Sequence, residues 1–442
     1  MKSELSFFYC AVRNLRTFIE YRRLMRQQRM SRDALLEINW QRRQAIVRHA
    51  YETSPFYAGF YRSFGFHPND LVSREHWCKI PLLCREHIAE CREGMISNTA
   101  RSRDLFPVTT GGTTGAILKS YHDRRYPVGA IGWRALAWCG FKPNVNMACI
   151  WRASAGNQSR ISQFLDKLKV YAPQQILLDA SSMTEASVRQ FLERYKCMGP
   201  AILQGYVGGL HYLAEFLRAT GTEVAAPLAV WSTAAPLSAV QRSLFERTFN
   251  SPVYDQYGSC EVYWIATECF RHEGLHINSD VRHLDFVDDN GADVPCGADG
   301  KIAVTDLENY AFPLIRYKNG DMGHAIEKPC SCGIGLPLMG PVLGRVSETM
   351  SFPNHVVISG EYLTTIFDDY PTAVRAFQVV QRRDSSLLVR VVANVPDDAI
   401  APVLACVSAV LRDKTQGCVP IQIEIVAQIP HDRGKLRYIV KE

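Results

Sequence analysis

Short apolar runs alternate with amphipathic stretches through the middle of the chain. The runs have the length of strands, whereas the stretches repeat apolar residues every three or four positions, as helices do. Examples of the predicted buried strands are Met147–Trp151, Ala201–Leu203 and Leu228–Ser232. The predicted helices cover residues 183–197, 207–219 and 237–249. This order predicts an α/β fold with largely parallel strands, because helices then connect neighbouring strands.

The segments on either side of this region have different patterns. Residues 31–100 predict helices interrupted by breakers such as Ser54-Pro55. A strand-rich region is predicted from Leu275 to about Ile326. The N-terminal part should therefore contain layered mixed sheets together with helices.

The pattern changes again after Arg345. The C-terminal elements that we predict are a strand pair at Phe377–Gln381 and Leu387–Ala393, a helix at about residues 397–412 and a strand at Ile421–Val426. Together they form a small α+β unit. We therefore predict a large domain over residues 1–345 and a small mobile domain over residues 346–442, joined by a hinge.

Composition and charge are those of a soluble globular protein. The 442 residues are 47% hydrophobic and 21% charged, and a chain of this length usually forms two or more domains. The net charge of +6 is scattered, without a dense run of lysine and arginine among aromatic residues, so we expect no nucleic-acid partner. Fourteen cysteines without a secretory leader indicate reduced thiols and a cytoplasmic location.

The N-terminal segment predicts an amphipathic helix. Its apolar positions are Phe7, Phe8, Val12, Leu15, Phe18 and Ile19, with Arg13, Arg16, Arg22, Arg23 and Arg26 among them. The apolar stretch is too short and too interrupted for a signal peptide or a transmembrane segment. We expect this helix to pack on the body of the protein; the alternative is a helix that lies on an acidic membrane surface.

A loop rich in threonine and glycine is the first candidate for chemistry. It contains Thr109, Thr110, Gly111, Gly112, Thr113, Thr114 and Gly115. Glycines let backbone N–H groups turn toward an anion, and threonine hydroxyls add donors, so the loop can hold phosphates. It is not a Walker A loop, because no Gly-Lys-Ser/Thr follows. A plain turn between strands is the alternative.

Three later segments carry charged residues at turns. Glu261 follows the aromatic turn of Tyr257 and Gly258 and could hold Mg²⁺, which bridges phosphate oxygens. Asp321 could accept hydrogen bonds from ribose hydroxyls, and Lys435 could neutralise charge on a reacting phosphate. Taken singly, each segment is more often a surface turn, so none of them identifies a function alone.

In their order along the chain, these segments resemble the adenylate-forming superfamily, in particular its branch of phenylacetate–coenzyme A ligases and capsule-biosynthesis ligase-like proteins. The resemblance extends from about His49 to the C-terminus and includes His49–Tyr57, Ile80–Leu82, Leu203–Tyr206 and Phe377–Gln381. It implies an ATP-dependent enzyme that converts a carboxylic acid to acyl-AMP with release of pyrophosphate. The acyl group is then transferred, by default to coenzyme A.

The resemblance also implies a role for each matching residue. The segment Thr109–Gly115 matches the loop that closes over the ATP phosphates. The residues that match the adenine site are Ser232, Ala234, Ala235, Pro236, Tyr257 and Gly258. Asp321 matches the ribose ligand, and Glu261 matches the carboxylate that binds Mg²⁺. Arg345 matches the arginine at the hinge, and Lys435 matches the lysine that the small domain brings in for adenylation.

Departures from the family pattern bear on these roles. Ala116 replaces the usual lysine of the loop, Ala235 replaces the acidic residue of the adenine segment, and Glu348 replaces the hinge aspartate. The residues predicted to line the acyl pocket are Tyr206, Gly208, Tyr263 and Trp264. If Tyr263 and Trp264 face it, the pocket is shallower than one for a phenylacetyl group; packing in the core is the alternative.

Two thiols in a C-x-C turn, Cys330 and Cys332, could bind one metal ion. Upstream, Cys269 and the two histidines that follow it, His272 and His276, offer a third and a fourth ligand. A Cys₃His set suits tetrahedral structural zinc. The resemblance supports such a site, with Cys269, His276, Cys330 and Cys332 as ligands. Ordinary reduced cysteines are the alternative.

Other functions stay open from the sequence. The acceptor could be an amine, giving an amide in natural-product or polysaccharide biosynthesis, or a carrier protein. Ala116 and Ala235 also suit a degenerate nucleotide-binding protein without catalytic activity. The expected cofactors are ATP, Mg²⁺, structural Zn²⁺ and coenzyme A. The sequence identifies neither the acid nor the oligomeric state, for which a homodimer is one option.

Overall fold

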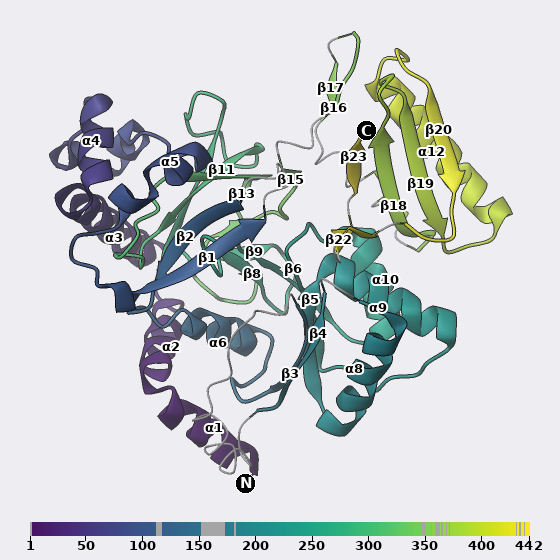
Figure 1. Ribbon diagram of the computed structural model, residues 1–442, viewed down its shortest axis with the longest axis horizontal. Helices are drawn as coiled ribbons and strands as arrows, with labels where there is room; N and C mark the ends of the chain where they lie inside the picture. The colour runs from purple at the N-terminus through teal and green to yellow at the C-terminus, as the bar shows by residue number, and fades with distance from the viewer. Residues whose placement is uncertain are drawn as a thin grey trace. The chain divides into compact units, whose positions relative to one another are not determined.

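A computed structural model describes residues 2–442 except residues 112–116, 152–172, 181–182, 346–349, 355, 359–362, 364–365, 368, 371, 430, 433–434 and 437. The chain forms two compact units, each assembled from separate stretches of sequence (Figure 1). The first unit contains residues 1–10, 143–255 and 343–442, and the second contains residues 11–142 and 256–342.

A parallel sheet with helices forms one part of the first unit. Its strands are β3 (Asn146–Trp151), β4 (Gln175–Asp179), β5 (Ala201–Tyr206), β6 (Ala229–Thr233) and β7 (Val253–Tyr257). They are ordered β4-β3-β5-β6-β7, and neighbouring strands pair in parallel. The helices are α8 (Glu185–Met198), α9 (Val207–Thr220) and α10 (Ala239–Phe249). The predicted α/β fold with parallel strands is confirmed.

Helix α8 shows why these stretches become helices. Thr184 caps its N-terminus, because its hydroxyl accepts a hydrogen bond from the Ser187 N–H at 3.2 Å. Gly199, with φ of +76°, follows its last residue in a conformation that favours glycine. Its buried residues recur three or four positions apart, so one face packs on the core. They are Val188, Phe191, Leu192, Tyr195 and Met198.

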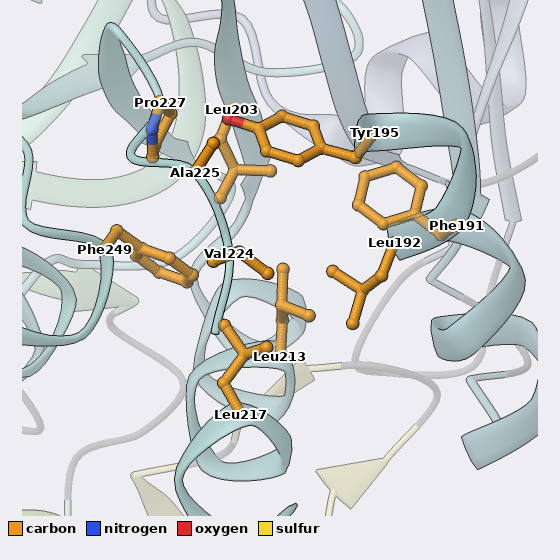
Figure 2. A pocket seen from close by; sticks show the side chains of 10 residues that line it. All are labelled: Phe191, Leu192, Tyr195, Leu203, Leu213, Leu217, Val224, Ala225, Pro227 and Phe249. Atoms are coloured by element: carbon orange, nitrogen blue, oxygen red, sulfur yellow. The ribbon is translucent and has the colours of Figure 1, made fainter. Parts of the chain in front are cut away.

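A small apolar cavity lies beside α8 and α9. Figure 2 shows its lining, which consists of Phe191, Leu192, Tyr195, Leu203, Leu213, Leu217, Val224, Ala225, Pro227 and Phe249. None of these side chains is charged, and burial raises the pKa of the Tyr195 hydroxyl to about 12. A site for a polar ligand presents several convergent polar groups. The cavity therefore belongs to the hydrophobic core.

The C-terminal part of the first unit is a small α+β fold. Its sheet has the order β20-β19-β18-β23, and one helix, α12 (Asp397–Lys414), accompanies it. The strands are β18 (Val374–Gln381), β19 (Leu387–Ala393), β20 (Ile421–Ile425) and β23 (Ile439–Lys441). β18 and β19 pair antiparallel, whereas β20 and β23 add in parallel. The predicted small α+β fold at the C-terminus is confirmed. A short antiparallel pair, β16 (Met350–Ser351) and β17 (Val357–Ile358), precedes it.

The second unit combines helices with antiparallel strands. Its helices are α2 (Leu15–Gln27), α3 (Arg32–Thr53), α4 (Pro55–Ser63), α5 (Arg85–Met95) and α6 (Gly129–Trp138). Helix α1 (Lys2–Arg13) begins in the first unit and ends in the second. β1 (Leu105–Gly111) and β2 (Ile117–Asp123) form a hairpin. A second antiparallel group contains β10 (Arg282–Val287), β11 (Gly300–Asp306) and β12 (Tyr317–Gly323). From the end of β7, a third group continues through β8 (Ala266–Glu268), β9 (Leu275–Ile277), β14 (Leu338–Met339) and β13 (Ala325–Ile326).

The predicted break at Ser54-Pro55 separates α3 from α4. Pro55 is the first residue of α4, where its missing N–H costs no helical hydrogen bond. The Ser54 hydroxyl accepts from the Tyr57 N–H at 3.5 Å and donates to the Gly94 carbonyl at 2.9 Å. Ser54 therefore both caps α4 and ties it to α5.

A buried polar cluster holds α3 against β10. Trp77 Nε1 donates to Asp285 Oδ1 at 2.9 Å, and His283 Nε2 lies 3.1 Å from the same oxygen. Arg43 stacks on the Trp77 ring at 4.7 Å from its centre. Burial alone would raise the pKa of Asp285, but His283, Arg316 and Trp77 lower it to about 2. Burial lowers the pKa of His283, so the cluster pairs a carboxylate with a neutral imidazole at neutral pH.

Candidate active site

Side chains from β7 and β12 form a hydrogen-bonded group in the second unit. The Tyr257 hydroxyl donates to Asp321 Oδ2 at 3.0 Å. Asn319 Nδ2 donates to the same carboxylate oxygen at 3.0 Å and to the Tyr257 hydroxyl at 2.6 Å. The Asp321 N–H in turn donates to Asn319 Oδ1 at 3.1 Å. The structure thus brings together Tyr257 and Asp321, both predicted, through Asn319, for which no role was predicted.

Glu261 lies buried beside a hydroxyl and a guanidinium group. The Tyr317 hydroxyl donates to Glu261 Oε1 at 3.1 Å, and Arg85 Nη1 lies 3.8 Å from the same oxygen. Burial raises the pKa of Tyr317, and the neighbouring Glu261 raises it further, so the hydroxyl keeps its proton and donates. Both contacts fall on Oε1, so the carboxylate is oriented through one oxygen.

Strand β2 brings His122 against the turn that carries Glu261. The His122 and Tyr263 rings are stacked, with their centres 4.1 Å apart. His122 Nε2 lies 2.8 Å from the Cys260 carbonyl oxygen, which can only accept, so Nε2 carries the proton. Burial lowers the pKa of His122 and favours the neutral ring, which leaves Nδ1 as an acceptor. Tyr263, a predicted acyl-pocket residue, is positioned by this stack.

Trp264 packs against helix α6. A Cβ atom at Gly132 would lie 2.7 Å from Trp264 Cζ2, so this close approach requires glycine. The cluster that Trp264 joins contains Leu24, Ala130, Ile131 and Val281. This is the core packing considered as the alternative for Trp264. Its role in the acyl pocket stays a prediction.

In the first unit, other predicted residues lie at the carboxyl ends of two parallel strands, where ligands of open α/β sheets bind. Ser232, near the end of β6, is fully buried and donates to Asp255 Oδ1 at 3.0 Å. Ala234 has φ of +70° and is exposed, so the chain turns out of the sheet there, before the half-buried Ala235 and Pro236.

Tyr206 ends the neighbouring strand β5. Its ring packs on that of Trp151, with the centres 4.5 Å apart. Gly208 is buried in the first turn of α9. A Cβ atom at the next residue, Gly209, would lie 2.7 Å from Ile150 Cγ2, so the glycines let α9 begin close to β3.

The remaining predicted nucleotide residues are described in part. Thr109, Thr110 and Gly111 form the end of β1, and Thr109 is exposed. Outside the described residues lie Gly112, Thr113, Thr114, Gly115, Ala116 and Glu348. Arg345 is the last residue of β15 (Gly344–Arg345). Lys435 begins β22 (Lys435–Leu436), which pairs with β21 (His431–Asp432) and lies against α9 within the first unit.

The register of the β1–β2 hairpin identifies a cation near the loop. Thr109 lies opposite Lys119, and Thr110 lies opposite Leu118. Leu118 is buried, whereas Thr109 and Lys119 are exposed. Residues directly opposite in an antiparallel pair share one face, so the hairpin presents Thr109 and Lys119 together on its open face.

Cys269, His276, Cys330 and Cys332 converge within the second unit. Their ligand atoms all lie within 4.8 Å of one another. The Cys269 and Cys330 sulfur atoms are 3.7 Å apart, and Cys332 Sγ lies 3.3 Å from His276 Nε2. Sulfur atoms at about 2.3 Å from a tetrahedral zinc ion are about 3.8 Å apart. The spacing therefore fits zinc, and it includes His276 as predicted, without His272.

Neighbouring groups hold these ligands in place. Glu273 accepts hydrogen bonds from the Ser331 N–H at 2.8 Å and hydroxyl at 2.6 Å, which fixes the C-x-C turn. His276 Nδ1 lies 3.3 Å from the Leu336 carbonyl, so it carries the proton and leaves Nε2 as the ligand atom. Burial raises the pKa of Cys269 and lowers that of His276 to about 4. A cation would stabilise the thiolate form of Cys269 that burial alone disfavours.

Several side chains at these positions have no predicted role. Tyr317 and Asn319 could have been found from the sequence, because they lie in the same short segment as Asp321, Arg316–Asp321. No local pattern marks Arg85 or His122, whose contacts join segments that are distant in sequence.

Sequence comparison finds relatives at low identity. A family model described as the CapK C-terminal domain matches residues 350–442. The phenylacetate-coenzyme A ligase of Thermus thermophilus is 24% identical over 372 residues, which is 81% of this chain and 80% of the relative. Protein CapK of Staphylococcus aureus is 23% identical over 299 residues, which is 65% of this chain and 62% of the relative.

Solved structures share the fold. A 2-hydroxyisobutyryl-CoA ligase in the postadenylation state, in complex with R3-HIB-AMP, has a TM-score of 0.70 at 18% identity. The alignment covers 91% of this chain and 89% of that protein. The amide bond synthetase McbA from Marinactinospora thermotolerans has a TM-score of 0.50 at 16% identity, covering 76% of this chain and 67% of McbA.

The chain shares the fold of the AMP-forming ligases, so the predicted fold is confirmed, and its similarity in sequence to a coenzyme A ligase agrees with the predicted enzyme class. Within that class, its similarity is to phenylacetate–coenzyme A ligases and CapK, which confirms the resemblance inferred from the motifs. Among the helices that the structure describes, none is long and apolar enough to cross a bilayer.

Proposed function

We propose that this protein uses ATP to convert a carboxylic acid to acyl-AMP, releases pyrophosphate and transfers the acyl group to an acceptor, by default coenzyme A. One observation supports this most directly. Two tyrosine–carboxylate hydrogen bonds connect residues 257–261 with strand β12: Tyr257 donates to Asp321, and Tyr317 donates to Glu261. These hydrogen bonds fix the two carboxylates relative to each other, as a nucleotide and its metal ion require.

Asp321 is proposed to accept hydrogen bonds from the ribose hydroxyls. Two donors, Tyr257 and Asn319, already hold Oδ2, so the carboxylate does not have to be ordered when ligand binds. Binding groups that are ordered in advance lose less entropy on association. On the first unit, the residues Ser232, Ala234, Ala235 and Pro236 are proposed to contact adenine, because they match that segment of the family.

Glu261 is proposed to bind Mg²⁺, which would offset the negative charge of the phosphates. A carboxylate is the hard oxygen ligand that this ion prefers. Tyr317 and Arg85 both contact Oε1, and they thereby orient the carboxylate for a cation at its other oxygen.

Three further roles rest on the resemblance to the family. Thr109–Gly115 are proposed to hold the phosphates, and Arg345 to contact the nucleotide at the hinge. Lys435 is proposed to stabilise the charge that develops at the α-phosphate. Rotation of the predicted small domain, residues 346–442, would then admit the acceptor while water stays away from the mixed anhydride.

The acceptor is the less determined half of the reaction. Sequence relatives named phenylacetate-coenzyme A ligase favour a thioester product. The fold shared with an amide bond synthetase keeps an amine acceptor as the alternative. The acyl pocket is proposed to be shaped by Tyr206, Gly208, Tyr263 and Trp264. A cytoplasmic location, where ATP and coenzyme A are available, stays a prediction.

Pyrophosphate exchange with a panel of aryl, hydroxy and amino acids tests adenylation. We expect at least one acid to stimulate exchange, and we expect Lys435→Ala to lower that exchange about 100-fold or more, because transition-state charge loses its counterion. The variant should keep the rise in melting temperature that ATP causes. Lys441→Ala changes an exposed lysine of β23 and serves as the control.

Two results would contradict the proposal. One is a panel without any stimulating acid together with no effect of ATP on the melting temperature. The other is loss of ATP binding and of the folded state in Lys435→Ala, which would assign that lysine a structural role. With an active acid identified, mass spectrometry of the products formed with coenzyme A or with amines distinguishes thioester from amide.

We also propose that Cys269, His276, Cys330 and Cys332 hold one structural zinc ion. Protein purified without added zinc should contain about one equivalent, and Cys332→Ser should lower both the zinc content and the melting temperature. Cys296→Ser, which changes an exposed cysteine of the same unit, is the control. Less than about half an equivalent in the unaltered protein would refute the site.

A further inference from the structure

The two N-terminal helices present apolar side chains that the chain leaves exposed. Leu15 and Ile19 on α2 are 57% and 60% exposed, and Val12, near the end of α1, is 60% exposed. Leu15 and Ile19 are four residues apart, so they share a face of α2. We call Val12, Leu15 and Ile19 the N-terminal row. Exposed apolar residues that are grouped in this way favour an interaction site, whereas single exposed apolar residues do not.

The opposite face of α2 is fixed to the second unit. Leu24 is fully buried and packs with Ala130 and Ile131 of α6. Arg23 donates to Glu20 Oε2 at 2.8 Å and to Glu308 Oε1 at 3.3 Å. Helix α2 therefore packs on the body, as expected, but not through the N-terminal row. Leu15 and Ile19 therefore lie on the outer face of a helix that is already anchored.

Positive charge surrounds the N-terminal row. Residues 1–30 contain seven lysine and arginine residues but only two glutamates. The exposed cations are Arg13, Arg16, Arg22, Arg26 and Arg29. Of the two glutamates, Glu20 accepts hydrogen bonds from Arg23 and Tyr126, so its charge is offset locally. The surface is thus apolar and cationic at once.

The arrangement of these charges indicates the kind of partner. Arg22 follows Leu15 by seven residues, and Arg26 follows Ile19 by seven, so arginines and apolar residues occupy the same face of α2. The core of a protein interface is depleted of charged residues, because burial would desolvate them. At a lipid surface, arginine stems can extend so that the guanidinium groups stay among the headgroups while apolar side chains enter the acyl boundary.

We infer that the N-terminal row and its arginines bind the surface of an anionic phospholipid bilayer, with α2 lying in the plane of the headgroups. Anionic headgroups complement the five exposed arginines, and the row supplies the apolar contact. Because α2 is folded and anchored beforehand, binding needs no ordering of this segment. The inference does not depend on the reaction proposed above.

Co-sedimentation of the full chain with vesicles tests this inference. We expect binding to vesicles that contain about one quarter phosphatidylglycerol, and binding about tenfold weaker or less to phosphatidylcholine alone. Binding should be lost at about 1 M salt, where charges are screened within about 3 Å. Leu15→Ser with Ile19→Ser, and separately Arg22→Glu with Arg26→Glu, should each weaken binding about tenfold or more.

Controls separate lipid binding from general apolar adhesion. Phe64→Ser with Val72→Ser removes two apolar residues of the same unit that are 64% and 73% exposed, and it should bind as the unaltered protein does. No enrichment on anionic over neutral vesicles would overturn the inference, as would full binding by Leu15→Ser with Ile19→Ser. A third result would also overturn it: the protein does not bind vesicles but self-associates in sedimentation velocity, and Leu15→Ser with Ile19→Ser abolishes that self-association.

Discussion

Glu261 and Asp321 are each held by a tyrosine hydroxyl from the other's segment. Tyr257, four residues before Glu261, donates to Asp321, and Tyr317, four residues before Asp321, donates to Glu261. Loosening one hydrogen bond therefore leaves the other carboxylate in place. The two proposed roles, ribose binding and metal binding, can be tested separately at the level of single side chains.

Tyr317→Phe tests the metal role of Glu261. A hydrogen bond to a charged group contributes about 1.5–3 kcal/mol, so its loss should lower the rate of pyrophosphate exchange about tenfold to 100-fold. Because the carboxylate is then less well oriented for a cation, the Mg²⁺ concentration for half-maximal exchange should rise. Titration of exchange with Mg²⁺ at saturating ATP measures both effects.

Tyr57→Phe is the matched control for this substitution. Tyr57 is also fully buried, but its hydroxyl donates to the Pro313 carbonyl at 2.9 Å, away from both carboxylates. The control should lower the melting temperature and leave the Mg²⁺ dependence unchanged. If Tyr317→Phe shows the Mg²⁺ dependence of the unaltered protein, Glu261 is not the metal ligand.

At this scale, the sequence predicts residues that lie in local motifs and misses those that reach them from elsewhere. Tyr257, Glu261 and Asp321 were predicted because each lies in a short local motif. Arg85 and His122 were not, because their contacts depend on packing between α5, β2 and the turn after β7. Only the fold brings such segments together.

Strand β2 of the β1–β2 hairpin carries a lysine, Lys119, close to the loop in which Ala116 replaces a lysine. The loop has Ala116 where the family usually has lysine. In the hairpin register, Lys119 is paired with Thr109, the first residue of the proposed phosphate loop, and both are exposed. Lys119 can therefore place a positive charge near bound phosphates from the stem of the hairpin instead of from its loop.

Lys119→Ala should raise the KM for ATP about fivefold to tenfold with little change in kcat, because a screened contact with phosphate contributes on the order of 1 kcal/mol. Lys119→Arg should keep the low KM. Lys79→Ala removes an exposed lysine from the same unit and should have no effect. Initial rates of exchange against ATP concentration provide the measurement, and a KM unchanged by Lys119→Ala would exclude this role.

Elements with a strong pattern were predicted, and elements with a weak one were not. β3, β5 and β6 are apolar runs in a parallel sheet that is buried on both faces, so their sequence is distinctive. β4, at the end of the same sheet, alternates buried and exposed positions over five residues and was missed. The two-residue strand β14, beyond the predicted strand-rich region, is too short for any periodicity, and only its pairing with β13 and β9 defines it.

In the whole molecule, the two units defined by packing differ from the two domains predicted from the sequence pattern. A change in pattern predicted one boundary near Arg345, and Leu343 begins the last segment of the first unit. The other boundaries, after Cys10, Lys142 and Asp255, are not marked by a change in sequence pattern, because each unit is completed by segments that return from elsewhere. The division at residue 345 between a large and a mobile small domain stays a prediction.

Acid should destabilise the folded protein through histidines that it buries in the neutral form. Burial lowers the pKa of His283 below its unfolded value of about 6.5, and burial lowers the pKa of His122 in the same way. The unfolded chain then binds more protons, so the stability contributed by each group is complete above about pH 6.5 and declines as the pH falls below it. Asp285, with its pKa lowered to about 2, stays ionised in this window and does not oppose the effect.

The slope of melting temperature against pH measures the contribution of His283. A single group of this kind lowers the free energy of unfolding by at most about 1.4 kcal/mol per pH unit. Between pH 7.5 and 5.5, the melting temperature should therefore fall less steeply for His283→Gln than for the unaltered protein. At pH 7.5 the variant should be less stable, because Asp285 loses a hydrogen-bond partner. His67→Gln, at an exposed position, should keep the original slope. If His283→Gln keeps the slope of the unaltered protein, the cluster of Arg43, Trp77 and Asp285 tolerates a protonated imidazole. His283 is then held as a cation between an arginine and a carboxylate.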